Sequence, residues 1–94
     1  MKIKSGYILR EVAGTFLVVA VGKRAKEFNG MINLNSTAAE LWKELEKGGT
    51  EDSLTEFLLN NYKVEEKKAR DNVSAFIKKL KEADLLENEE GENK

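Results

Sequence analysis

The stretch that decides the fold is residues 30–42, GMINLNSTAAELW, where the hydrophobic pattern changes its period. Its first half, Gly30 to Leu34, is a short β-rich run, and its second half places apolar residues at helical spacing. Between the halves lie Asn35, Ser36 and Thr37, residue types that favour the starts of helices. The chain is therefore predicted to change from strand to helix inside this stretch.

Two β-rich segments precede this junction, Gly6 to Val12 and Thr15 to Val21. Tyr, Ile, Val, Phe and Thr dominate them, as is typical of a pleated, half-buried surface. Only Ala13–Gly14 separates the two segments, and glycine supplies the positive φ that a tight hairpin turn needs. The continuous apolar run Phe16 to Val21 predicts a central strand, which leaves Gly30 to Leu34 as an edge strand.

Three helices are predicted after the junction, because apolar residues recur there at helical spacing. In the first two helices a Thr or Ser lies three residues before a Glu, as in a capping box: Thr37 with Glu40, and Ser53 with Glu56. Gly48–Gly49 ends the first helix. The first helix is expected to follow Asn35 to Thr37, the second to begin near Thr50 to Ser53, and the third to span about Glu65 to Ala83.

The order of three strands and then three helices predicts an α+β domain, with the helices packed on one face of a three-stranded antiparallel sheet. The apolar stripes of the helices should form the core, aromatic side chains included. The expected core residues are Ala38, Leu41, Trp42 and Leu45 in the first helix, Leu54, Phe57, Leu58 and Tyr62 in the second, and Ala69, Val73, Phe76, Ile77 and Leu80 in the third.

Ninety-four residues suffice for one core, and we place the single domain at residues 1–86. Residues 22–29 carry Lys23, Arg24 and Lys26, which indicates an exposed loop between the second and third strands. Residues 87–94, ENEEGENK, contain no apolar side chain and are predicted to be a disordered acidic tail.

The composition excludes much chemistry, because the chain contains neither Cys nor His. It therefore has no thiolate nucleophile, no disulfide, no zinc or iron–sulfur site of the usual kinds, and no imidazole base. A formal net charge of −1 supplies no overall field that would attract nucleic acid. We expect a binding module with no catalytic residues, no metal and no cofactor.

No segment is suited to a membrane. The longest apolar run, Phe16 to Val21, is about a third of a spanning helix, and the first residues lack the features of a signal peptide. We therefore expect a cytoplasmic protein.

The predicted edge strand is the first candidate site. One row of its backbone N–H and C=O groups is left unpaired, so an extended peptide could add to it as a further strand. The alternative is that a loop covers this edge or that a second copy of the chain pairs with it in a homodimer.

The last helix is the second candidate, because its lysines from Lys78 to Lys81 could steer an acidic ligand. The alternative is an ordinary solvated face, since Glu65, Glu66, Asp71 and Glu82 lie in the same segment.

Three segments together carry a family resemblance. Residues 30–42 resemble the strand-to-helix junction of the PqqD family, which is named for coenzyme PQQ synthesis protein D. Residues 7–21, YILREVAGTFLVVAV, resemble the family's opening hairpin, and residues 71–86 resemble its closing helix. The sequence departs from the family at Asp84, where Gly is common, although Asp tolerates the left-handed conformation.

The resemblance implies a winged-helix-like fold and the function of a RiPP recognition element, a domain that binds the leader of a ribosomal precursor peptide. It implies that the leader adds beside the third strand and lies against the third helix, and that a separate enzyme, often a radical SAM maturase, modifies the peptide. The positions carried over are Met31, Ile32, Asn33 and Leu34 on the edge, and Arg70, Val73, Ser74, Ile77 and Lys81 on the helix, with Asn72, Phe76 and Lys79 as further candidates.

Two other functions are compatible with this topology. One is a winged-helix DNA-binding protein, which Glu65 and Glu66 at the start of the third helix argue against. The other is an adaptor domain that uses the same edge to bind a protein partner.

Overall fold

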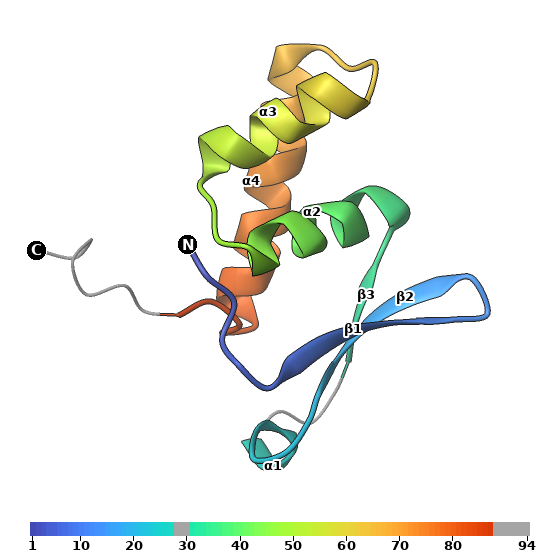
Figure 1. Cartoon of the computed structure of the whole chain (residues 1–94), viewed down its shortest axis with the longest axis vertical. Coiled ribbons are helices and arrows are strands. Elements are labelled where there is room, and N and C mark those ends of the chain that lie inside the picture. Colours follow the sequence, from blue (N-terminus) through green and yellow to red (C-terminus); the bar gives the residue numbers. More distant parts are fainter. Residues whose placement is uncertain (28–30, 88–94) are drawn as a thin grey trace, which may run out of the picture.

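Three antiparallel strands precede three long helices in the computed structural model, which describes residues 1–27 and 31–87 (Figure 1). The α+β architecture predicted from the sequence is therefore confirmed. The elements are β1 (Tyr7–Val12), β2 (Thr15–Ala20), α1 (Arg24–Glu27), β3 (Met31–Leu34), α2 (Ser36–Glu46), α3 (Glu51–Asn61) and α4 (Glu66–Glu82).

The segment between β2 and β3 differs from the prediction. An exposed loop was expected over residues 22–29, but four of these residues form α1, a single helical turn at the end of the sheet away from the long helices (Figure 1). Gly30, the first residue of the predicted third strand, lies outside the described residues.

The hairpin turn agrees with the prediction. Ala13 and Gly14 both have positive φ, 52° and 79°, as the two central residues of a type I′ turn require. This turn places Val12 opposite Thr15 and sets the register of β1 and β2 along their whole length. Ala13 is strained, since a residue with a Cβ in this conformation costs about 1–2 kcal/mol.

The sheet order is β1-β2-β3, so β2 is central and β3 is an edge strand, as predicted. Alternate residues enter the core from one face of the sheet, and they include Tyr7, Val18 and Leu34. α2 and α4 contribute large buried side chains such as Trp42 and Leu80 to this core, and α3 packs on α4 and α2 (Figure 1). Every predicted core residue of α4 is buried, whereas Tyr62 at the end of α3 is 37% exposed and was wrongly assigned to the core.

The helix caps differ from those predicted. Asn35 caps α2, where its side-chain Oδ1 accepts a hydrogen bond of 2.8 Å from the Ala38 N–H, and Thr37 lies inside the helix. Thr50 and Ser53 form the capping box of α3, in which each side chain accepts from the other's backbone N–H. Both real caps lie upstream of the expected ones, by two residues in α2 and three in α3.

A left-handed residue ends α4. Asp84 has φ 61°, which confirms that Asp adopts the conformation for which Gly is usual. The Leu85 N–H donates to the Leu80 carbonyl at 2.9 Å and the Asp84 N–H donates to the Lys81 carbonyl at 3.0 Å. These two bonds form a Schellman motif, which turns the chain back and buries Leu85.

The two ends of the described chain pair with each other, which the sequence reading did not foresee. Ile3 forms an antiparallel bridge with Leu86, and the Lys4 N–H donates to the Leu85 carbonyl at 2.8 Å. The Glu87 N–H donates to the Lys2 carbonyl at 2.8 Å, so the backbone stays bonded through the first residue of the predicted tail. The rest of that tail, residues 88–94, lies outside the described residues.

The cap assignment predicts unequal effects for two neighbouring substitutions. Asn35→Ala removes the acceptor for an N–H in the first turn of α2 and should lower the free energy of unfolding by about 1 kcal/mol. Thr37→Ala should cost clearly less, because Thr37 is not the cap. Urea denaturation of both variants measures the difference, and a larger loss for Thr37→Ala would contradict the assignment.

Candidate functional site

The hydrogen-bonding pattern of the sheet determines which backbone groups of β3 are open. The Val21 N–H donates to the Gly6 carbonyl at 2.8 Å, one step beyond the pair of Tyr7 with Ala20. Because groups alternate along an antiparallel strand, the odd-numbered residues of β2 bond to β1 and the even-numbered ones bond to β3.

The same alternation continues into β3. Phe16 lies opposite Leu34 and Val18 lies opposite Ile32, so Ile32 and Leu34 form the hydrogen-bonded pairs with β2. The backbone N–H and C=O groups of Met31 and Asn33 consequently point away from the sheet.

The side chains of β3 show the same alternation between odd- and even-numbered residues. Leu34 is buried and Ile32 is half-buried against the core, whereas Met31 is 61% exposed and Asn33 is exposed. The two residues that hold β3 to β2 therefore also anchor it to the core, and the two with open backbone groups carry solvent-facing side chains.

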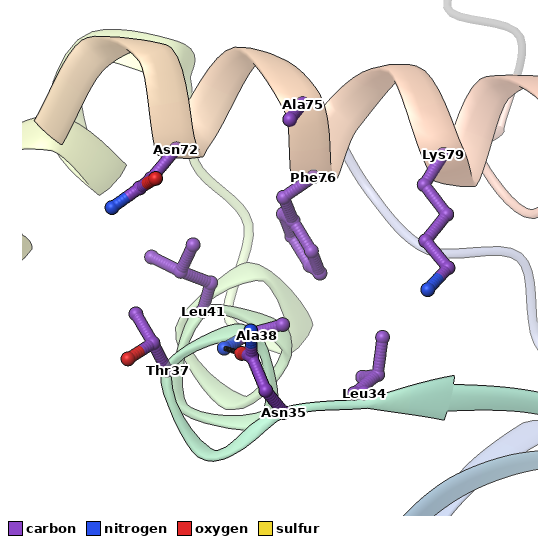
Figure 2. A pocket seen from close by; sticks show the side chains of 9 residues that line it. All are labelled: Leu34, Asn35, Thr37, Ala38, Leu41, Asn72, Ala75, Phe76 and Lys79. Carbon is purple, nitrogen blue, oxygen red and sulfur yellow. Dashed lines mark hydrogen bonds between the residues drawn. The ribbon is translucent and has the colours of Figure 1, made fainter. Parts of the chain in front are cut away.

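A hollow of about 270 Å³ opens where β3 meets α2 and α4. Figure 2 shows Phe76 and Lys79 projecting from α4 toward β3, with Leu41 on α2 across from them. Apolar side chains and amide, hydroxyl and ammonium groups line the hollow in similar measure. The lining residues are Leu34, Asn35, Thr37, Ala38, Leu41, Asn72, Ala75, Phe76 and Lys79.

One hydrogen bond joins α4 to the open edge directly. The Lys79 Nζ donates to the Asn33 carbonyl oxygen at 2.8 Å. This bond agrees with the hydrogen-bonding pattern of β3, in which the Asn33 carbonyl oxygen points away from β2. The hollow and the open edge of β3 thus form one continuous site beside α4.

Several helix residues predicted for the site do not line the hollow. Val73 and Ile77 are 1% and 2% exposed in the core. Arg70 donates to Asp52 and to Glu66, at 3.1 Å each, and hydrogen bonds to these two carboxylates raise the pKa of its guanidinium above the ordinary value.

Ser74 and Lys81 follow Arg70 at helical spacing, so both lie on its flank of α4, and both are exposed. The flank that borders β3 instead carries the further candidates Asn72, Phe76 and Lys79, and also Ala75. A binding role for Arg70, Val73, Ser74, Ile77 and Lys81 stays a prediction.

The sequence reading missed the contribution of α2 to the site. Asn35, Thr37, Ala38 and Leu41 line the hollow, although they were read only as helix start and core. Spacing alone gave no signal for this role, because the same residues would be expected at the start of any helix that packs on a sheet.

Among residues 1–27 and 31–87, no cluster of three or more His, Cys, Asp or Glu side chains is placed to hold a metal ion. In the same part of the chain, no helix is long and apolar enough to cross a membrane. What the site does offer is open backbone groups and a hollow lined by both apolar and polar side chains, the ammonium of Lys79 among them.

Comparison with known proteins gives one family and two related folds. The sequence profile of coenzyme PQQ synthesis protein D (PqqD) matches residues 6–86. No curated protein sequence matches the chain significantly.

Two solved structures have a similar fold. TbiB1 in complex with the TbiA(beta) leader peptide superposes with a TM-score of 0.74 at 17% identity, covering 95% of this chain and 98% of that one. Lasso peptide synthetase B1 complexed with the leader peptide has a TM-score of 0.70 at 21% identity, covering 89% and 93%. At these identities the likeness establishes the fold.

The alternating hydrogen bonds of β3 to β2 predict how proline substitutions affect stability. Ile32→Pro removes the N–H that bonds to buried Val18, so it should cost about 1–3 kcal/mol more than Ile32→Ala. Asn33→Pro removes only an outward N–H, which edge strands tolerate, and should cost much less. Thermal denaturation of the three variants measures these effects. Equal destabilisation by the two prolines would contradict the assigned pairing.

Proposed function

The chain belongs to the PqqD family, and from this premise we propose that it is a non-catalytic module that binds the leader of a ribosomal precursor peptide. The observation that carries the proposal is the open edge of β3 beside a hollow of mixed apolar and polar lining, with Met31 and Asn33 directing their backbone groups outward. Both structures of similar fold are described as complexes with a leader peptide, which supports it.

The geometry indicates how an extended peptide would bind. The outward N–H and C=O groups of Met31 and Asn33 pair with the peptide backbone whatever its sequence. Peptide side chains opposite Ile32 and Leu34 point toward α4 and the hollow, because side chains alternate across a strand. Backbone bonds therefore supply affinity, and every second side chain of the peptide supplies selectivity.

The other peptide side chains meet the outer face of the sheet. Ile8, Val19 and Met31 lie side by side across the three strands on this face. A peptide residue opposite Met31 would extend this apolar row, and cross-strand apolar pairs stabilise a sheet by about 0.2–1 kcal/mol each. We therefore expect an apolar residue at that position of the leader.

The module would act by tethering. Holding the leader raises the local concentration of the rest of the peptide at an enzyme bound to the same module, without any chemistry by the module itself. The enzyme proposed from the family is a separate radical SAM maturase.

DNA binding is not favoured by the structure. A recognition helix needs a basic surface near its start, whereas acidic groups offset the basic ones there in α4: Lys67 pairs with Asp71, and Arg70 pairs with Asp52 and Glu66. The main alternative is that a second copy of the chain pairs with the β3 edge and forms a homodimer. Size-exclusion chromatography would then show a dimer, and a bound leader would dissociate it.

The proposed binding mode is tested with the leader of a precursor encoded beside the gene, or with a binder selected from displayed linear peptides. Asn33→Pro and Met31→Pro should abolish binding in a calorimetric titration while the fold survives. Glu11→Pro is the matched control, because it removes an outward N–H from the opposite edge of the sheet, on β1, and should bind normally. Unchanged affinity in a folded Asn33→Pro variant would place the peptide elsewhere.

The module should also be inert when alone. Incubated with its precursor peptide and common cofactors, the chain should leave the mass of the peptide unchanged, as mass spectrometry would show. Turnover without a second protein would refute a non-catalytic role.

A further inference from the structure

The contact between Lys79 and β3 occupies the edge that the peptide would use. The Lys79 Nζ lies 2.8 Å from the Asn33 carbonyl oxygen, although the two residues are 46 positions apart in the chain. This oxygen is one of the outward acceptors of β3. An added strand that donates an N–H to it competes with the ammonium for the same atom.

Among the described residues, no carboxylate pairs with this ammonium. Lys4, Lys47 and Lys67 each form a salt bridge, but within residues 1–27 and 31–87 Lys79 forms none. The residues that line the hollow include no Asp or Glu. Glu82, three residues along α4, is the carboxylate of the same helix that a released Lys79 could reach.

If a peptide displaces Lys79 from the Asn33 carbonyl oxygen, the ammonium is left beside the hollow without an acceptor. A carboxylate on the incoming peptide restores a partner at that place, whereas a neutral side chain leaves the ammonium to water or to Glu82. Side chains alternate along an added strand. The carboxylate must therefore belong to a peptide residue opposite Ile32 or Leu34, whose side chain points toward α4.

We propose that Lys79 is a specificity-determining residue: it masks the Asn33 carbonyl in the free protein and, once displaced, binds an Asp or Glu side chain of the peptide. This inference rests on the proposed function and names the class of peptide that the same site selects. Lys79 thus couples the opening of the edge to the recognition of an acidic side chain.

The masking contact can be tested without any peptide. In a sample with ¹⁵N-labelled lysine side chains, the Lys79 ammonium should be more ordered and slower to exchange than that of exposed Lys78. It should also show a coupling through the hydrogen bond to the Asn33 carbonyl carbon. A Lys79 ammonium as mobile as that of Lys78 would overturn the masking role.

The recognition of an acidic side chain is tested by selecting displayed linear peptides on the wild type, on Lys79→Met and on Lys78→Met. The wild type and Lys78→Met should enrich Asp or Glu at one inward-pointing position, and Lys79→Met should not. Lys78→Met removes the same charge, so any loss of long-range steering is common to both variants.

Affinities measured on one selected peptide make the test quantitative. Replacing its acidic residue by the matching amide should weaken binding to the wild type by about two- to fivefold, the range of an exposed ion pair, and leave Lys79→Met unaffected. The amide peptide should bind Lys79→Met more tightly than the wild type, because no masking contact has to break. A preference for the acid that persists in Lys79→Met would overturn the inference.

These experiments distinguish a failure of the inference about Lys79 from a failure of the proposed peptide binding at β3. If the selected peptides bind Asn33→Pro as well as they bind the wild type, the site of strand addition is wrong, and the recognition role of Lys79 is refuted with it. If they require Asn33 but ignore the substitution of Lys79, only the present inference is refuted.

Discussion

The one-sided hydrogen bonding of β3 is the constraint on which the candidate site depends. Ile32 and Leu34 join the strand to β2 through their backbone and to the core through their side chains. Because both properties alternate with the same period, Met31 and Asn33 are left with outward backbone groups and solvent-facing side chains. The strand is thus held firmly in place while one of its edges stays open.

An open edge is also a hazard, since it can pair with any other strand in solution. Here β3 is only four residues long, and α4 runs beside it with Lys79 bonded to the edge itself. Short edge strands and lysines are common ways in which proteins limit unwanted pairing. In our proposal, the lysine that protects this edge in the free protein also selects a peptide with an acidic side chain.

Local patterns predicted the sheet and the helices well, because their information lies within a few residues. Ala13–Gly14 encodes the hairpin turn, and the apolar stripe from Ala69 to Leu80 encodes the buried face of α4. The caps were misplaced because Asn35, Ser36 and Thr37 are all good capping residues, and local sequence does not choose among them.

What the sequence could not show depends on contacts between distant segments. Arg70, on the flank of α4 away from β3, pairs with Asp52 of α3, a contact that spacing within α4 does not reveal. The bridge between Ile3 and Leu86 joins opposite ends of the chain, which no local periodicity records. The sequence therefore left two flanks of α4 open, and tertiary packing places the one that carries Asn72, Phe76 and Lys79 beside β3.

The central claim, that a peptide adds as a strand to the open edge of β3, is tested most directly by amide hydrogen exchange at single-residue resolution. In the free protein the Ile32 and Leu34 amides should be protected by β2, while those of Met31 and Asn33 exchange fast. With a bound peptide, Met31 and Asn33 should become protected as well. If their exchange stays fast while the peptide protects another surface, the account is wrong.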